Sequence, residues 1–204
     1  MKIRNILILL ILMPFMLNAQ VDTIYQLDSK LIKKHLKPSS NQYLVFIQRK
    51  GDPRQTYTYI WSRDVKFANK NGKELIEIDQ KWYASDTARA RYVYSVMNAN
   101  DFSPVYHYTK MGKSIEAYDF YPDKINGSDS VENNAKKDFE LALKKPMLNW
   151  ELDLETFPLL DLKPGRRFAI NFYHPGGKTE PKLYEYKVIG EENITVLSGG
   201  TVAC

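Results

Sequence analysis

The residue types that come closest to an active site lie in the segment from Trp150 onward, where Glu151, Asp153 and Glu155 place three carboxylates within five residues. Paired carboxylates perform acid–base chemistry when burial splits their pKa values. Together with His174, Asp153 and Glu155 form the dispersed polar group that a hydrolase would need. On a helix, however, Glu151 and Glu155 share one face, and a charged helix face is ordinarily solvated. We therefore assign no catalytic residue.

Metal and nucleophile chemistry find less support in the sequence. His35, His107 and His174 fall in a predicted helix, a strand and a turn, without metal-ligand spacing. The chain lacks the Gly-x-Ser-x-Gly and His-Glu-x-x-His motifs, and its single thiol is Cys204. Its glycine pairs lack the spacing of a phosphate-binding loop. We predict neither a metal site nor a cofactor.

Aromatic side chains are the remaining candidates for a function, because the chain holds 14 Tyr, 9 Phe and 3 Trp. Many of them alternate with polar residues and fall on one face of a predicted strand. Such a face either lines a concave site for a lipid-like, apolar or amphiphilic ligand, or packs across strands and fixes their register. Tyrosine suits the first role, since its ring is apolar and its tip is polar. The candidate ligand-binding residues are Tyr57, Tyr59, Trp61, Tyr92, Tyr94, Tyr106, Tyr108, Tyr118 and Phe120.

The elements that carry these residues are predicted to be mainly β-strands. From residue 42 onward, apolar residues recur with a period of two in about ten short runs separated by turn signals. Asn71-Gly72 is such a signal, because both residues accept the positive φ of a tight hairpin. No parallel crossover unit is recognisable. We therefore predict one large antiparallel sheet, curled into a barrel or half-barrel, with one or two helices.

Two segments are predicted to be helical. Residues 24–37 form an amphipathic pattern whose basic face is either solvated or contacts a membrane surface. Residues 149–160 form the second helix, with Asn149 as its N-cap. The stretch 136–145 fits both periods, and we prefer a strand because its apolar residues alternate and Pro146 follows it.

Five segments together are similar to a known family. The chain resembles exported bacterial proteins of the domain of unknown function 3108 type. The segments that carry the resemblance are 148–158, 162–165, 170–173, 184–188 and 200–204.

This resemblance extends over roughly residues 40–204. It implies a strongly bent antiparallel sheet around a helix, with an apolar concave side like that of periplasmic lipoprotein carriers, and it implies no catalytic residue. In such proteins, further strands follow the strand that bears the cysteine. The end at Cys204 therefore leads us to expect a truncated domain, or one without its closing strands.

Residues 1–19 have the composition of a secretory signal peptide, because Lys2 and Arg4 precede an apolar run from Ile6 to Leu17. A spanning helix needs about 20 apolar residues, and this run is shorter. We therefore expect export to the periplasm or the exterior, and a single β-rich domain, residues 20–204, that does not span the membrane.

Charge and cysteine content narrow the classes of partner. Removing Lys2 and Arg4 lowers the formal net charge from +5 to +3, and this excess is scattered, which argues against nucleic acid. With Cys204 as the single cysteine, the chain can form no intrachain disulfide and has no lipid-attachment site near residue 20. The first hypothesis is thus an exported, soluble, non-enzymatic binding or carrier-like module. The alternatives are a structural or protein-interaction module of the bacterial envelope and, third, the hydrolase.

Overall fold

The computed structural model describes residues 21–27, 32, 34–195 and 199–203. The predicted signal peptide, residues 1–19, and Cys204 lie outside the described residues. Within these residues, no helix is both long and apolar enough to cross a bilayer.

The first predicted helix, residues 24–37, falls partly on residues that are not described. Ile24 ends strand β1 (Val21–Ile24) and does not begin a helix, whereas Ile32, Lys34 and His35 are helical. The predicted start of this helix at residue 24 was therefore wrong, because Ile24 belongs to a strand that pairs with a distant strand.

Eight strands form one antiparallel sheet in which each strand pairs with the next in the chain. Asn71 and Gly72 take φ values of 52° and 77°, as a tight hairpin requires. The preference for a strand within 136–145 is confirmed at Glu140–Ala142. The sheet stays open, so the mainly β class with a large curled antiparallel sheet is confirmed. The strands are β2 (Ser39–Arg49), β3 (Asp52–Lys70), β4 (Lys73–Ala84), β5 (Arg91–Asn98), β6 (Pro104–Met111), β7 (Ser114–Phe120), β8 (Lys124–Gly127) and β9 (Glu140–Ala142).

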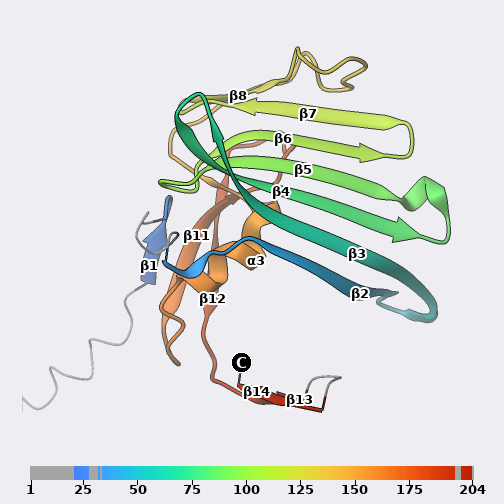
Figure 1. Ribbon diagram of the computed structural model, residues 1–204, viewed down its shortest axis with the longest axis vertical. Helices are drawn as coiled ribbons and strands as arrows, with labels where there is room; N and C mark the ends of the chain where they lie inside the picture. Colours follow the sequence, from blue (N-terminus) through green and yellow to red (C-terminus); the bar gives the residue numbers. More distant parts are fainter. Residues whose placement is uncertain (1–20, 28–31, 33, 196–198, 204) are drawn as a thin grey trace, which may run out of the picture.

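A second, smaller sheet forms around β11 (Arg167–Tyr173), with β12 (Lys182–Lys187) antiparallel to it. Strands β1 and β10 (Leu148–Asn149) run parallel to β11. We did not predict parallel pairing, because a local pattern does not reveal which distant segments lie side by side. A two-stranded hairpin, β13 (Asn193–Thr195) with β14 (Thr201–Ala203), lies apart at the lower end of the view (Figure 1).

A short helical segment follows β10 and contains the predicted second helix. It consists of the 3-10 turn η3 (Trp150–Leu152), the α-helix α3 (Asp153–Thr156) and the 3-10 turn η4 (Phe157–Leu159). The predicted N-cap is confirmed, since the Asn149 side chain accepts a hydrogen bond from the amide of Glu151.

The core lies between the helical segment, the smaller sheet and one face of the large sheet. We call this the inner face; it carries Val65, Ile76 and Ile78, which pack with Leu152 and Ile170. A second cluster, which includes Tyr118 and Ile125, lies under β7 and β8. These clusters bury only part of the inner face. Toward the start of β3 and the end of β4, its side chains are half-buried.

Candidate functional site

The sheet register places the nine candidate aromatic residues on two opposite faces. Trp61 pairs with Trp82 in β4, on the inner face with Ile78, whereas Tyr92 pairs with Lys81, whose side chain points to the opposite, outer face. Successive side chains alternate, so five candidates lie on the inner face and four on the outer. The inner five are Tyr57, Tyr59, Trp61, Tyr118 and Phe120, and the outer four are Tyr92, Tyr94, Tyr106 and Tyr108.

The four outer tyrosines pack against each other across strands. The rings of Tyr92 and Tyr108 lie 5.8 Å apart, and those of Tyr94 and Tyr106 lie 6.2 Å apart. The Tyr92 hydroxyl donates a hydrogen bond of 2.7 Å to Asp79, and burial raises the pKa of Tyr106 to about 12. The outer tyrosines thus pack across strands, which is the alternative to ligand binding that the sequence left open.

Tyr118 and Phe120 on the inner face are core residues. Their exposed fractions are 1% and 8%, and they pack with Ile125, Met147 and Tyr173. Neither ring has surface left for a ligand.

Tyr57, Tyr59 and Trp61 remain, and they belong to a larger group of half-buried rings. Trp61 lies between Tyr43 on β2, with ring centroids 4.9 Å apart, and Trp82 on β4, stacked at 4.6 Å. The Tyr59 ring meets Trp82 edge-on at 6.0 Å. We call Tyr43, Tyr59, Trp61 and Trp82 the aromatic column. The sequence reading missed Tyr43 and Trp82, although both lie in alternating runs, because only the register reveals that they flank Trp61.

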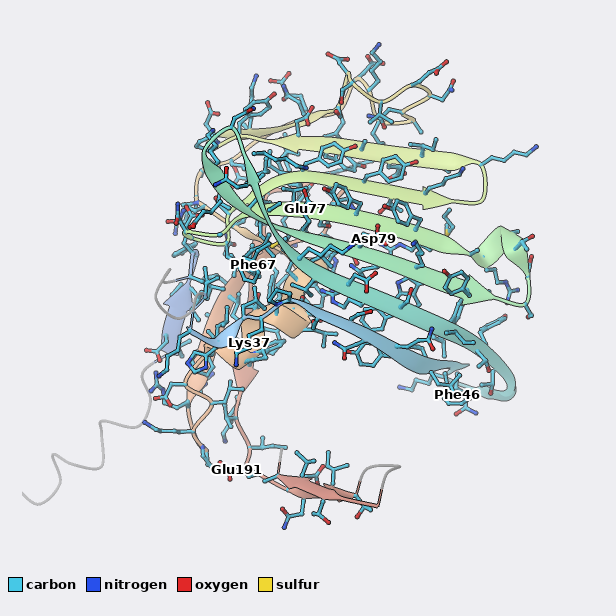
Figure 2. All side chains as sticks on the ribbon, viewed as in Figure 1. Lys37, Phe46, Phe67, Glu77, Asp79 and Glu191 are labelled. Atoms are coloured by element: carbon cyan, nitrogen blue, oxygen red, sulfur yellow. The ribbon has the colours of Figure 1, made fainter. Side chains whose placement is uncertain are left out.

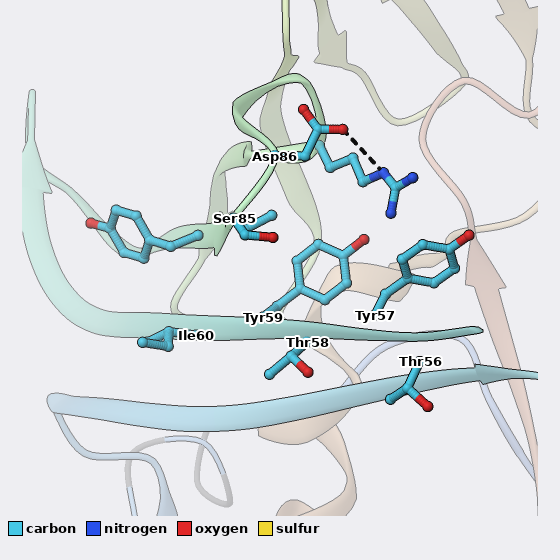
Figure 3. A pocket seen from close by; sticks show the side chains of 10 residues that line it. Thr56, Tyr57, Thr58, Tyr59, Ile60, Ser85 and Asp86 are labelled. Atoms are coloured by element: carbon cyan, nitrogen blue, oxygen red, sulfur yellow. Dashed lines mark ion pairs between the residues drawn. The ribbon is translucent and has the colours of Figure 1, made fainter. Parts of the chain in front are cut away.

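One pocket, of about 510 Å³, lies beside the start of β3 and the turn after β4. Figure 3 shows Tyr57 and Tyr59 on the side of β3 that faces Asp86, with Thr56 and Thr58 on the other side. Asp86 pairs with Arg89, whose guanidinium lies 4.2 Å from the centre of the Tyr57 ring. This end pocket therefore has aromatic walls and a polar rim.

A second pocket, of about 490 Å³, lies where the inner face meets the helical segment. All three tryptophans of the chain line it, and Trp150 stacks on His174 with ring centroids 4.2 Å apart. We call it the indole pocket. Its polar lining consists of Arg63, Gln80, Arg91, Glu151, Asp153 and His174.

Both arginines of the indole pocket are engaged by carboxylates. Arg91 donates to Glu151 at 2.5 Å, and the buried Arg63 forms two hydrogen bonds with the buried Glu155. The prediction that these glutamates form a solvated helix face was wrong for Glu155, because its face of the segment packs on β3. Asp153 has no ion-pair partner among the described residues, and burial raises the pKa of its carboxyl.

The fold brings together only two of the three residues that a hydrolase site would need. Asp153 and His174 line the same pocket, but Glu155 is held by Arg63. His107 is fully buried and contacts Ser95 and Thr109 at 2.9 Å each, and burial lowers its pKa to about 4. In the described part of the chain, no three His, Cys, Asp or Glu side chains are grouped to hold a metal ion.

Comparison with known proteins gives one match. Residues 43–204 match a family model described as "Protein of unknown function (DUF3108)". Neither a curated protein nor a solved structure matches the chain.

Proposed function

We propose that this chain, which belongs to the DUF3108 family, is an exported, non-enzymatic binding or carrier-like module for an apolar or amphiphilic ligand. Its place of action is the periplasm or the exterior, after removal of the signal peptide, residues 1–19.

One observation carries the proposal: among the described residues, no layer is packed over the aromatic part of the inner face to complete a core. Tyr57, Tyr59, Trp61 and Trp82 are all half-buried and line two pockets, whereas Val65 and Ile78 farther along the same strands are buried. Half-buried aromatic walls with a few polar groups are typical of sites for small amphiphilic molecules. Tyr59 of the end pocket contacts Trp82 of the indole pocket, with ring centroids 6.0 Å apart, so aromatic side chains lead from one pocket to the other.

The direct test is extraction of the purified native protein with organic solvent, followed by mass spectrometry of the extract. We expect a co-purifying apolar or amphiphilic compound. Titration calorimetry with a dodecyl detergent below its critical micelle concentration should then show saturable binding. A Tyr59→Leu variant should bind about fivefold more weakly, since a well-placed aromatic contact contributes on the order of 1 kcal/mol.

Tyr121→Ser is the matched control, because Tyr121 is 47% exposed and lines neither pocket. Both variants must first show the thermal unfolding of the parent protein. Absence of any extracted compound, together with absence of detergent binding, would contradict the proposal.

A second candidate function is a protein-interaction module of the envelope. It is favoured by the edge strand β2, which carries the exposed Phe46 (Figure 2). Leu44 and Phe46 are 61% and 62% exposed, and no described strand pairs with the free edge of β2. An exposed apolar edge strand is a template for pairing with another chain. Pull-down from envelope extracts, with the parent protein and with a Phe46→Ser variant, separates the two functions. If the protein is an interaction module, the variant should lose the captured partner; if it is a ligand carrier, this change should leave ligand binding intact.

A further inference from the structure

Carboxylates outnumber arginines at the indole pocket once the partner of Arg63 is counted. Arg91 is paired with Glu151, and Arg63 is paired with Glu155. Asp153 is the carboxylate left over: it accepts a hydrogen bond from the amide of Leu154. The pocket is lined by two arginines and two carboxylates, Glu151 and Asp153. Glu155 pairs with Arg63 from outside this lining, so the two arginines together face three carboxylates, and Asp153 is the one without an ion-pair partner among the described residues.

Indoles and two arginines form much of the lining around this charge. Trp61, Trp82 and Trp150 line the same pocket as Asp153. The face of an indole attracts cations, and the attraction grows as the cation leaves water. Trp61 is covered by Tyr43 and Trp82, and the Arg63 guanidinium lies 5.4 Å from its ring centre, so the half-buried Trp82 and Trp150 are the indoles that a ligand can contact. Burial of the Asp153 carboxylate is costly and raises its pKa, and the nearby charge of Arg63 offsets only part of this shift. A cation in this pocket would therefore gain from the rings and from the carboxylate together.

We propose that the indole pocket binds an organic ammonium group, and that the ligand is an amphiphile with a cationic head. This inference rests on the proposed function. It places the ammonium group beside Asp153 and the apolar chain along β3 toward Tyr57 and the end pocket. Residues 57 and 61 are four strand residues apart, a span of about 13 Å, which accommodates an extended alkyl chain.

Other head groups fit less well. An anionic head would meet the unpaired Asp153, and both arginines would have to leave their carboxylates to compensate it. A neutral sugar head would leave the charge of Asp153 uncompensated. The test below therefore includes an anionic probe and a neutral sugar probe.

The test compares three probes that share one chain: dodecyltrimethylammonium, dodecyl sulfate and dodecyl maltoside, each below its critical micelle concentration, by titration calorimetry. We expect the cationic probe to bind about tenfold more tightly than either of the others. Asp153→Asn should remove this preference and leave the affinity for dodecyl maltoside unchanged. Asp153→Glu should retain it.

Asp129→Asn is the matched control, because the Asp129 side chain is 84% exposed and lies outside the pocket. Asp153 is the first residue of α3, so each variant is first compared with the parent in thermal unfolding. Equal affinity for the three probes, or tighter binding of the sulfate or the maltoside, overturns the inference and leaves the proposed function intact. Failure of all three probes to bind overturns the proposed function, and the inference with it.

Discussion

The guanidinium of Arg63 donates hydrogen bonds to both carboxylate oxygens of Glu155 and thereby joins strand β3 to helix α3. The two side chains are 3% and 8% exposed. Arg63 also donates to the main-chain carbonyl of Glu151 at 2.7 Å. This buried pair lies beneath the indole pocket and fixes the helical segment on the inner face of the sheet.

Breaking this pair should destabilise the protein strongly. Glu155→Gln leaves the guanidinium of Arg63 buried without a counter-charge, which costs about 3–5 kcal/mol. Urea unfolding measures the loss. Glu185→Gln is the control, because its pair with Arg167 is exposed and contributes at most about 1 kcal/mol. Equal effects of the two changes would show that the buried pair has no special role.

Stability should fall in acid through His107. Its pKa in the folded protein is about 4, against 6.5 for the free side chain, because burial disfavours the charged ring. Between these values the unfolded chain binds more protons than the folded protein. The contribution of His107 to stability is therefore complete above pH 6.5 and is lost as the pH falls through 4, a change of about 3 kcal/mol.

Urea unfolding between pH 4 and 7.5 checks this dependence. A His107→Gln variant keeps an amide that can bond with Ser95 and Thr109, and its stability should vary less over this range than that of the parent. His174→Gln is the comparison variant, because it changes an exposed histidine. Parallel profiles for the parent and the His107 variant would refute the prediction.

Gly127 should tolerate no side chain. A Cβ atom on this buried residue would lie 1.7 Å from the carbonyl oxygen of Lys136, a main-chain atom that cannot move aside alone. We expect Gly127→Ala to cost at least about 3 kcal/mol, or to abolish folding. Gly190→Ala is the matched change at a position with open space, and it should leave the melting temperature within a degree or two. Similar melting temperatures for the two variants would contradict the geometry.

The side chain of Asn134 should anchor the loop after β8. It donates to the carbonyls of Ala117 and Ser128 and accepts from the amides of Ala117 and Lys136, all within 3.0 Å. Asn134→Ala leaves several of these groups unsatisfied, at about 2–3 kcal/mol. Amide hydrogen exchange should then accelerate at the anchored amides of Ala117 and Lys136. Unchanged protection there would mean that the loop is held by other contacts.

Local patterns in the sequence determined the strands and the turns of this protein. Alternation with a period of two predicted the large antiparallel sheet, because a strand that is buried on one face needs an apolar residue at every second position. Asn71-Gly72 predicted its hairpin, and Asn149 predicted the N-cap of the helical segment, since both effects act within a few residues.

Only the tertiary structure decided which aromatic residues share a face. Trp61 and Tyr92 lie in strands that alternate equally well, but the pairing of β4 with β5 places them on opposite faces. Register depends on contacts between strands, and a shift by one residue would exchange the faces. No single strand carries that information.

The indole pocket likewise exists only in the folded chain. Trp61 and Trp82 come from the large sheet, whereas Trp150 and Asp153 come from the helical segment about 70 residues later. The sequence marked Asp153 as one of three neighbouring carboxylates. The fold distinguished it from the other two, because packing on β3 and β5 gave Glu155 and Glu151 arginine partners, whereas Asp153 has none among the described residues.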